Sequence, residues 1–209
     1  MAIIHQAELQ PTKLELLQGW LPRQPWFAGA AAALDKMGAF RFDDPEGEVG
    51  IETILVAADG AVFQVPLSYR GAPLDGAEAF LIGTMEHSVL GERWVYDAVG
   101  DSCYLDALAA AILTGQPQAQ HFLAVDGRLE PMPESVLVGS SGPLRSAAPG
   151  LGPGTVSNTD AETLVRAGAL ELLVIRRLEL AAQASGPGAL TGTWAGQDTP
   201  VKLAAVAAG

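Results

Sequence analysis

Residues 49–69, VGIETILVAADGAVFQVPLSY, are the stretch that decides the fold of this chain. Two apolar runs rich in β-branched residues meet there at Asp59-Gly60. A tight type I′ turn needs positive φ at both central residues, and Asp-Gly between β-rich segments is a strong signal for such a turn. The stretch therefore predicts a β-hairpin at the centre of a sheet.

Segments on both sides of this hairpin are predicted to be further strands of the same sheet. They cover residues 39–43 before the hairpin and residues 79–85 and 93–99 after it. The run 43–48 holds four carboxylates, and it lacks the alternating D-x-D-x-D-G pattern of a calcium-binding loop. We interpret that run as a solvated turn.

Two helices are predicted to pack on the sheet. The first covers residues 11–21, where proline suits the opening position and leucines recur at helical spacing. The second covers residues 101–114, with Asp101 as its amino-terminal cap and Gly115 directly after its last turn. Cys103 is the only cysteine, and with no neighbouring histidine or cation in the sequence we interpret it as a small buried or half-buried residue.

The chain changes character after about residue 134. Residues 139–154 are rich in Gly, Pro and Ser, which is typical of a flexible loop or linker. The predicted elements around and beyond this linker are a hairpin at 121–132, strands at 136–138, 162–166 and 171–178, a loose stretch at 181–192, and a last short strand or helix at 203–208. We therefore predict an α+β protein of two units, residues 1–134 and a smaller, mainly β unit of residues 135–209.

Composition limits the kind of partner that the chain can have. Its 209 residues carry 24 acidic and 12 basic side chains, which gives a formal net charge of −12. Nucleic acid and anionic membranes both require a basic face, so neither is an expected partner. The first residues lack the pattern of a signal peptide, and no apolar run approaches the roughly 18 residues needed to span a bilayer. We expect a cytoplasmic protein.

The sequence contains no motif of a catalytic or metal centre. The run GLGPG at 150–154 resembles a phosphate loop only superficially, because proline removes a backbone donor and no G-x-x-x-x-G-K-[ST] motif is present. His5, His87 and His121 are too far apart to form an H-x-x-x-H pair. No spacing marks two carboxylates as an acid and base pair. We therefore predict no catalytic residue, no cofactor and no metal ligand.

Five short segments together resemble bacterial maltokinases and related sugar kinases. In order, they are WLPRQPWFAG at 20–29, QVPLSY at 64–69, WVYDAVGDSCYLDALAAAI at 94–112, SNT at 157–159 and LLVIRRLE at 172–179. Independent short matches rarely keep both order and spacing, so the set is more specific than any one segment. The resemblance implies an amino-terminal cap, built as a curved antiparallel sheet with helices, followed by the small lobe of a kinase-like fold.

The departures from that family concern phosphoryl transfer. The resemblance implies a phosphate-binding lysine in the strand before Arg176 and Arg177, and this chain has Leu173 there. Phosphoryl transfer also needs a catalytic aspartate and Mg²⁺ ligands, yet no H-x-D-x-x-x-x-N run occurs and Asn158 is the only asparagine. The sequence ends where the family continues into its catalytic lobe. We therefore expect residues 135–209 to be a degenerate kinase small lobe, and we do not expect the chain to be a kinase.

Three functions stay open from the sequence. The first is a non-catalytic module that binds a protein partner or ligand in maltose, trehalose or α-glucan metabolism. Its candidate interaction surface consists of Trp20, Trp26, Phe27 and Trp94. Core packing is the alternative for each of these aromatic side chains. The second function is a small-molecule binding protein, for example for a sugar, with a pocket on the concave face of the sheet; the third is an enzyme of a type that no motif reveals.

Overall fold

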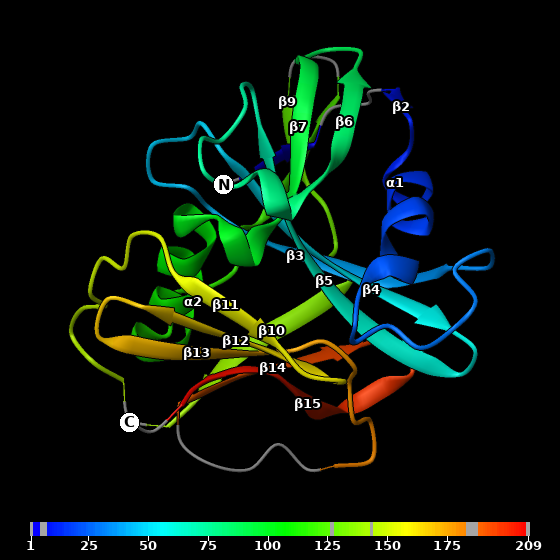
Figure 1. Ribbon diagram of the computed structural model, residues 1–209. Coiled ribbons are helices and arrows are strands. Elements are labelled where there is room, and N and C mark those ends of the chain that lie inside the picture. The colour runs from blue at the N-terminus through cyan, green and yellow to red at the C-terminus, as the bar shows by residue number, and fades with distance from the viewer. Residues whose placement is uncertain (1, 5–7, 126–127, 143, 183–187, 208–209) are drawn as a thin grey trace.

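The protein is mainly β, with strands over 46% of the chain and helices over 16%. The computed structural model describes residues 2–4, 8–125, 128–142, 144–182 and 188–207, and Figure 1 shows the arrangement of their elements. The strands of the described residues form three sheets, of six, six and three strands. The predicted α+β class is therefore correct only in its general form, because helices are a minor part of the structure.

The first six-stranded sheet, called the cap sheet here, is antiparallel and has the strand order β2-β6-β7-β5-β4-β3. Its strands are β2 (Leu9–Gln10), β3 (Asp35–Phe42), β4 (Gly50–Ala58), β5 (Ala61–Arg70), β6 (Leu81–His87) and β7 (Gly91–Asp97). The strands predicted from the sequence are all present, with shifted ends. Residues 98 and 99, the end of a predicted strand, belong instead to the 3₁₀ turn Ala98–Gly100 that leads into the second helix.

The β4–β5 hairpin at the centre of the cap sheet is confirmed. Ala58 pairs with Ala61, so Asp59 and Gly60 alone form the turn. Their φ angles of 48° and 78° are both positive, as a type I′ turn requires. The Asp59 carboxylate also accepts a hydrogen bond from the amide of Ala30 (2.6 Å), which attaches the turn to the preceding loop.

Gly60→Ala is expected to destabilise the protein by about 1 kcal/mol. A Cβ atom at Gly60 would meet no heavy atom within 4 Å, so the cost comes from the positive φ and not from a clash. Gly139→Ala is the matched control, because Gly139 also has open space around a Cβ atom but no positive φ. Urea denaturation should show a loss for Gly60→Ala alone, and equal losses would contradict this explanation.

Helix α1 (Lys13–Trp20) covers one face of the cap sheet. Thr12 caps it, and the side chains of Thr12 and Glu15 each accept a hydrogen bond from the other residue's backbone amide. Pro11 lies before this cap and not in the first turn, where it was predicted. Leu17 and Trp20 are the buried residues of the helix, and they pack with residues of β4 and β5 such as Val65.

Helix α2 (Ser102–Thr114) covers the opposite face, and Figure 1 shows it in green on the other side of the cap sheet from α1. Asp101 caps it as predicted, accepting a hydrogen bond from the amide of Cys103 (3.0 Å). Gly115 ends it in the left-handed conformation, also as predicted. Within the described residues, neither of these helices nor any 3₁₀ turn has the length and apolarity needed to cross a membrane.

The second six-stranded sheet, called the C-terminal sheet here, is also antiparallel and has the order β10-β14-β15-β13-β12-β11. Its strands are β10 (Val136–Ser141), β11 (Thr155–Asn158), β12 (Glu162–Ala167), β13 (Leu170–Ile175), β14 (Ala189–Trp194) and β15 (Gln197–Val206). The last predicted element is thus a strand, and it is longer than expected.

Two predicted loops are partly structured. The first three residues of the predicted linker 139–154 belong to β10, and near its end Leu151 is buried and donates its amide to Asp106 of α2 (2.7 Å). The last residues of the predicted loose stretch 181–192 belong to β14. The composition predicted both loops to be longer than they are, because glycine and serine also occur in strands that lie against a core.

The third sheet contains β1 (Ala2–Ile4), β8 (His121–Val125) and β9 (Arg128–Pro131). β8 and β9 are antiparallel, in agreement with the hairpin predicted at 121–132, and β1 is parallel to β8. The predicted turn at 126–127 lies outside the described residues.

A short segment beyond β13 continues the cap sheet. Along β5, only the second half of the strand pairs with β7. Beside the first half of β5, the amide of Gln64 donates to the carbonyl of Arg176 (2.8 Å), and the amide of Leu178 donates to the carbonyl of Val62 (2.8 Å). β5 is therefore shared between β7 and residues 176–178, and this strand joins the two large sheets.

Two apolar clusters surround the cap sheet. One fills the space between α1 and the sheet. The other lies on the opposite face and includes residues of α2 and of the C-terminal sheet. Its buried members come from both sides of residue 134, for example Leu55 and Leu105 before it and Val174 and Leu203 after it. The two predicted units, 1–134 and 135–209, therefore share a hydrophobic core.

Candidate functional site

The four aromatic residues of the candidate interaction surface differ in exposure. Trp20 and Trp26 are buried (5% and 1% exposed), and their rings meet edge to face with centroids 5.7 Å apart. Phe27 is half-buried, with its ring 4.8 Å from that of Phe63 on β5, and Trp94 on β7 is also half-buried. Core packing, which the sequence left as the alternative, describes Trp20 and Trp26. Only Phe27 and Trp94 retain exposed area for a partner.

A buried ion pair lies where β7 ends and the chain passes from β13 to the edge of β5. Arg176 is fully buried, and its Nη2 donates to both carboxylate oxygens of Asp97 (2.7 and 2.9 Å). Its Nε donates to the hydroxyl of Thr163 (2.7 Å), and its guanidinium lies 4.7 Å from the centre of the Trp26 ring. Burial raises the pKa of Asp97, and Arg176 opposes that rise. A buried charge is costly unless it is paired. Asp97 ends β7 of the cap sheet and Arg176 follows β13 of the C-terminal sheet, so this pair connects the two large sheets.

A polar side chain strengthens the same connection. Gln64 of β5 points to the C-terminal sheet, and its Nε2 donates to the carbonyls of Ile175 (2.9 Å) and Leu203 (2.8 Å). Buried amides are tolerated when their hydrogen bonds are made within the protein. Gln64 therefore holds β13, β15 and β5 at one point.

The side chains of Arg176 and Asn158 near β13 are engaged in structural contacts, whereas the Arg177 side chain is exposed. Leu173, at the place where the resemblance implies a lysine, is a half-buried residue of β13. Arg176 is held by Asp97. The side-chain oxygen of Asn158 accepts a hydrogen bond from Thr163 (2.6 Å). None of these three side chains presents an unpaired cation to a phosphate.

A second buried charged cluster lies between α1 and the cap sheet. Glu52 of β4 forms ion pairs with Lys13 of α1 and with Arg41 of β3 (3.5 Å), and it accepts a hydrogen bond from the Tyr69 hydroxyl (2.8 Å). Burial alone would raise the pKa of Glu52, but Lys13 and Arg41 reverse this effect and hold it well below its ordinary value. The carboxylate is therefore ionised at neutral pH and holds α1 on the sheet, and it is unsuited to act as a general acid.

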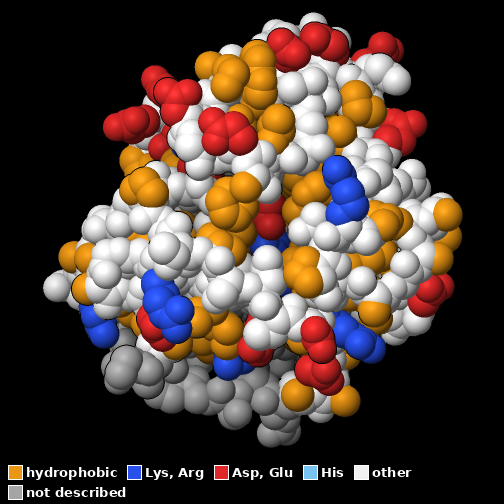
Figure 2. All heavy atoms as spheres, viewed as in Figure 1, with side chains coloured by type: hydrophobic (Ala, Val, Ile, Leu, Met, Phe, Trp, Pro, Cys, Tyr) orange, Lys and Arg blue, Asp and Glu red, His pale blue; other side chains and the backbone are white. Residues whose placement is uncertain are grey.

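A groove of about 730 Å³ opens beside α2. One wall is the β3–β4 loop with its carboxylates, and the others are the outer side of α2 and residues 146–150. Arg70 also lines the groove, where it donates two hydrogen bonds of 2.7 Å to Asp101. Acidic side chains also gather on the upper half of the face in Figure 2. A groove with this lining disfavours phosphate-bearing ligands and suits neutral or cationic ones.

Cys103 lines the groove and is half-buried, in agreement with the sequence interpretation. Burial and the nearby Asp44 carboxylate raise the pKa of its thiol to about 12. A thiol that stays protonated at neutral pH is a poor nucleophile. Within the part of the chain that the structure describes, no three His, Cys, Asp or Glu side chains are placed to hold a metal ion.

The space between α1 and the cap sheet is filled by side chains. Leu17, Leu67, Tyr69 and Met85 are among the residues around the gap there, and it has no room for a water molecule. This gap therefore leaves no space for a sugar. The groove lies instead at the end of the β3–β4 hairpin, beside α2.

Residues 20–101 match the family model of the maltokinase N-terminal cap domain. The match includes β3 to β7 and ends at Asp101, so the resemblance to this family is confirmed for the cap sheet. The segments at 157–159 and 172–179 lie outside the match, and the likeness of the C-terminal sheet to a kinase small lobe stays a prediction. No curated protein matches the chain.

Proposed function

We propose that this chain is a non-catalytic binding or regulatory module of maltose, trehalose or α-glucan metabolism, which acts by contact with an enzyme of that metabolism. The observation that carries the proposal is the match of residues 20–101 to the maltokinase N-terminal cap domain. The name of this family provides the link to maltose metabolism, and leucine in place of lysine at position 173 favours a role other than phosphoryl transfer.

The electrostatics of the described residues support a non-catalytic role. Phosphoryl transfer depends on cations that hold the phosphates of the nucleotide. Arg176 is buried in its pair with Asp97, and Arg70 is paired with Asp101 beside a groove lined by carboxylates. The carboxylates that line the groove would repel the phosphates of a nucleotide.

The surface for a partner is proposed to include the turn between β6 and β7. Val89 and Leu90 lie at this turn with 55% and 47% of their area exposed. The half-buried Trp94 lies further along β7. Exposed apolar side chains are common centres of protein contacts, and this turn is part of the segment that matches the cap family.

Affinity capture from a lysate of the source organism tests the proposal. The tagged protein is expected to recover an enzyme of trehalose or glycogen metabolism in stoichiometric amount. Val89→Asp/Leu90→Asp should reduce recovery by about tenfold or more, whereas Leu137→Asp, an exposed leucine on the C-terminal sheet, should not. Two results would contradict the proposal. One is ATP-dependent phosphorylation of maltose by the pure protein, and the other is a capture experiment that recovers no enzyme of trehalose or glycogen metabolism.

A sugar-binding protein is the second candidate function, and the groove beside α2 favours it. Volumes of about 300–1,000 Å³ are usual for small-molecule sites, and the groove is lined by hydroxyl and amide groups of Ser102, Thr114 and Gln116 in addition to carboxylates. Calorimetric titration with maltose and trehalose tests it. Saturable binding that Gln116→Leu weakens would support this function, and no heat of binding would exclude these two sugars as ligands.

A further inference from the structure

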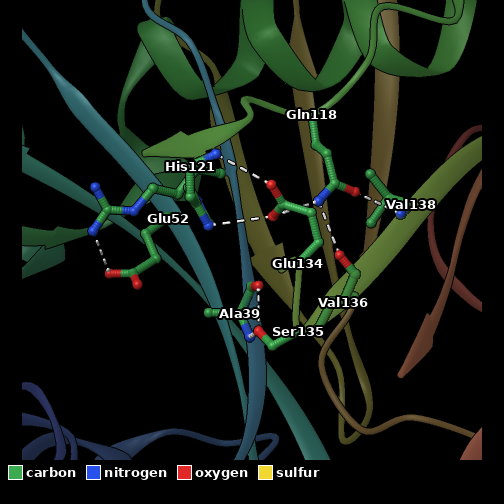
Figure 3. A network of polar contacts seen from close by, with 9 residues as sticks. Ala39, Glu52, Gln118, His121, Glu134, Ser135, Val136 and Val138 are labelled. Atoms are coloured by element: carbon green, nitrogen blue, oxygen red, sulfur yellow. Dashed lines mark hydrogen bonds and ion pairs between the residues drawn. The ribbon is translucent and has the colours of Figure 1, made fainter. Parts of the chain in front are cut away.

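The three sheets meet at one cluster of polar side chains, which Figure 3 shows from close by. Its centre is Glu134, two residues before the start of β10. The Glu134 carboxylate accepts hydrogen bonds from the backbone amide of His121 (3.2 Å) and from Nε2 of Gln118 (3.1 Å). Its other contact is with Nδ1 of the His121 ring (3.2 Å). One carboxylate thus binds the first residue of β8 at two points.

The same cluster reaches the edges of both large sheets. Gln118 follows the edge of β10, because its Nε2 donates to the carbonyl of Val136 (2.9 Å) and its Oε1 accepts from the amide of Val138 (2.8 Å). The Ser135 hydroxyl accepts from the amide of Ala39 and donates to its carbonyl, both at 2.9 Å, on the edge strand β3. Residues 134 and 135 therefore connect the β8–β9 hairpin, the cap sheet and the C-terminal sheet.

The His121 ring lies among groups of both charges. Glu134 contacts it directly, and the other charged groups that act on it are Arg41 of β3, Glu52 of β4 and Lys13 of α1. The His121 side chain is 13% exposed, and its Nε2 is buried without a hydrogen-bond partner among the described residues. Nδ1 is the ring nitrogen that contacts the carboxylate, so in the neutral ring with its proton on Nδ1 the atom that can take up a second proton is Nε2. A proton there would place a charge in a buried position, where no described residue accepts its hydrogen bond.

We propose that this junction is a pH-responsive clasp, in which uptake of a solvent proton by Nε2 of His121 loosens the attachment of the β8–β9 hairpin to the two large sheets. The clasp is made of Gln118, His121, Glu134 and Ser135. No covalent bond changes in this step, and the Nδ1–H remains on the ring. The proposal does not depend on which partner or ligand the protein binds.

The direction of the pH effect follows from the surroundings of the ring. Burial lowers the pKa of His121, Arg41 and Lys13 act in the same direction, and Glu134 and Glu52 oppose them. The folded protein therefore favours the neutral ring. The stabilisation from this ring is complete above the ordinary histidine value of 6.5 and is lost as the pH falls through the lower folded-state value.

Amide hydrogen exchange in β8 and β9 tests the clasp, with rates corrected for the intrinsic effect of pH. In the wild type, protection of these amides is expected to fall by about tenfold or more between about pH 7.5 and pH 5. His121→Gln cannot take up the proton and should lose this pH dependence. His87→Gln is the matched control, because His87 lies at the end of β6 and its Nδ1 accepts from the amides of the β6–β7 turn; this variant should retain the pH dependence.

Two results would overturn the proposal. One is a His121→Gln variant whose β8 and β9 amides keep the full pH dependence of the wild type. The other is an NMR titration of the His121 ring in the wild type that gives a pKa at or above 6.5. The titration needs no variant, so it decides the question even if His121→Gln does not fold.

Discussion

Replacing Asp97 by alanine is expected to lower the free energy of unfolding by about 3 to 5 kcal/mol. The substitution leaves the Arg176 guanidinium fully buried without its carboxylate partner. The remaining contacts of the guanidinium, with the Thr163 hydroxyl and the face of Trp26, do not carry a compensating charge. Urea denaturation followed by circular dichroism measures the loss.

A double variant separates the cost of an unpaired charge from the cost of a lost contact. Asp97→Ala/Arg176→Met removes both charges and is expected to be more stable than Asp97→Ala, because an apolar side chain needs no partner in this position. Asp198→Ala is the matched control: Asp198 is exposed on β15, and its loss should change stability by no more than about 0.5 kcal/mol. If Asp97→Ala and Asp198→Ala have equal effects, the ion pair does not stabilise the junction.

The elements of the cap sheet could be predicted because their signals are local. The Asp59-Gly60 turn and the ends of α2 at Asp101 and Gly115 each depend on the backbone conformation of one or two residues. Amino-acid type indicates such conformations directly, since glycine and short polar side chains tolerate positive φ or satisfy free helix amides. The pattern of the neighbouring segments placed the strands in one sheet, and the family resemblance implied a curved antiparallel sheet as well.

The junction between the sheets could not be predicted in the same way. Asp97 and Arg176 are 79 positions apart, and their pairing depends on how β5 is shared between two neighbours. A partial signal was present, because Gln64 and Asp97 are polar residues within apolar runs and such residues need internal partners when buried. That signal indicates that a partner exists, and it does not say which residue the partner is.

The candidate site also depends on contacts between distant segments, which the sequence does not reveal. A tryptophan in the sequence can belong either to a contact surface or to a core. Trp20 and Trp26 belong to the core because α1 packs on the cap sheet. The groove beside α2 is built from three segments that are distant in the sequence. The acidic run at 43–48 was correctly interpreted as a turn, since Asp44 accepts hydrogen bonds from three amides of its own loop, but its role as a groove wall depends on the position of α2.

Residues 1–134 alone are expected not to fold, although they include the whole cap sheet and both α-helices. In the full chain, one face of β4 and β5 and the inner side of α2 pack against the C-terminal sheet. Without that sheet, Leu55, Leu105 and Ile112 would face water, and Gln64 would lose its two carbonyl partners. Exposure of each large apolar side chain costs about 1.5 to 3 kcal/mol, so the loss for these three alone is comparable with the whole stability of a typical domain, about 5 to 15 kcal/mol.

Comparison of the fragment with the full chain tests this expectation. The full chain should unfold in one transition that circular dichroism and tryptophan fluorescence report at the same denaturant concentration, because Trp26 and Trp194 lie in cores that meet through β5. The fragment 1–134 should give no cooperative transition, and addition of the separate fragment 135–209 should restore it. A cooperative transition of 1–134 alone near the midpoint of the full chain would mean that the cap sheet is an independent domain, and that the shared core and the Asp97–Arg176 pair only hold two stable units together.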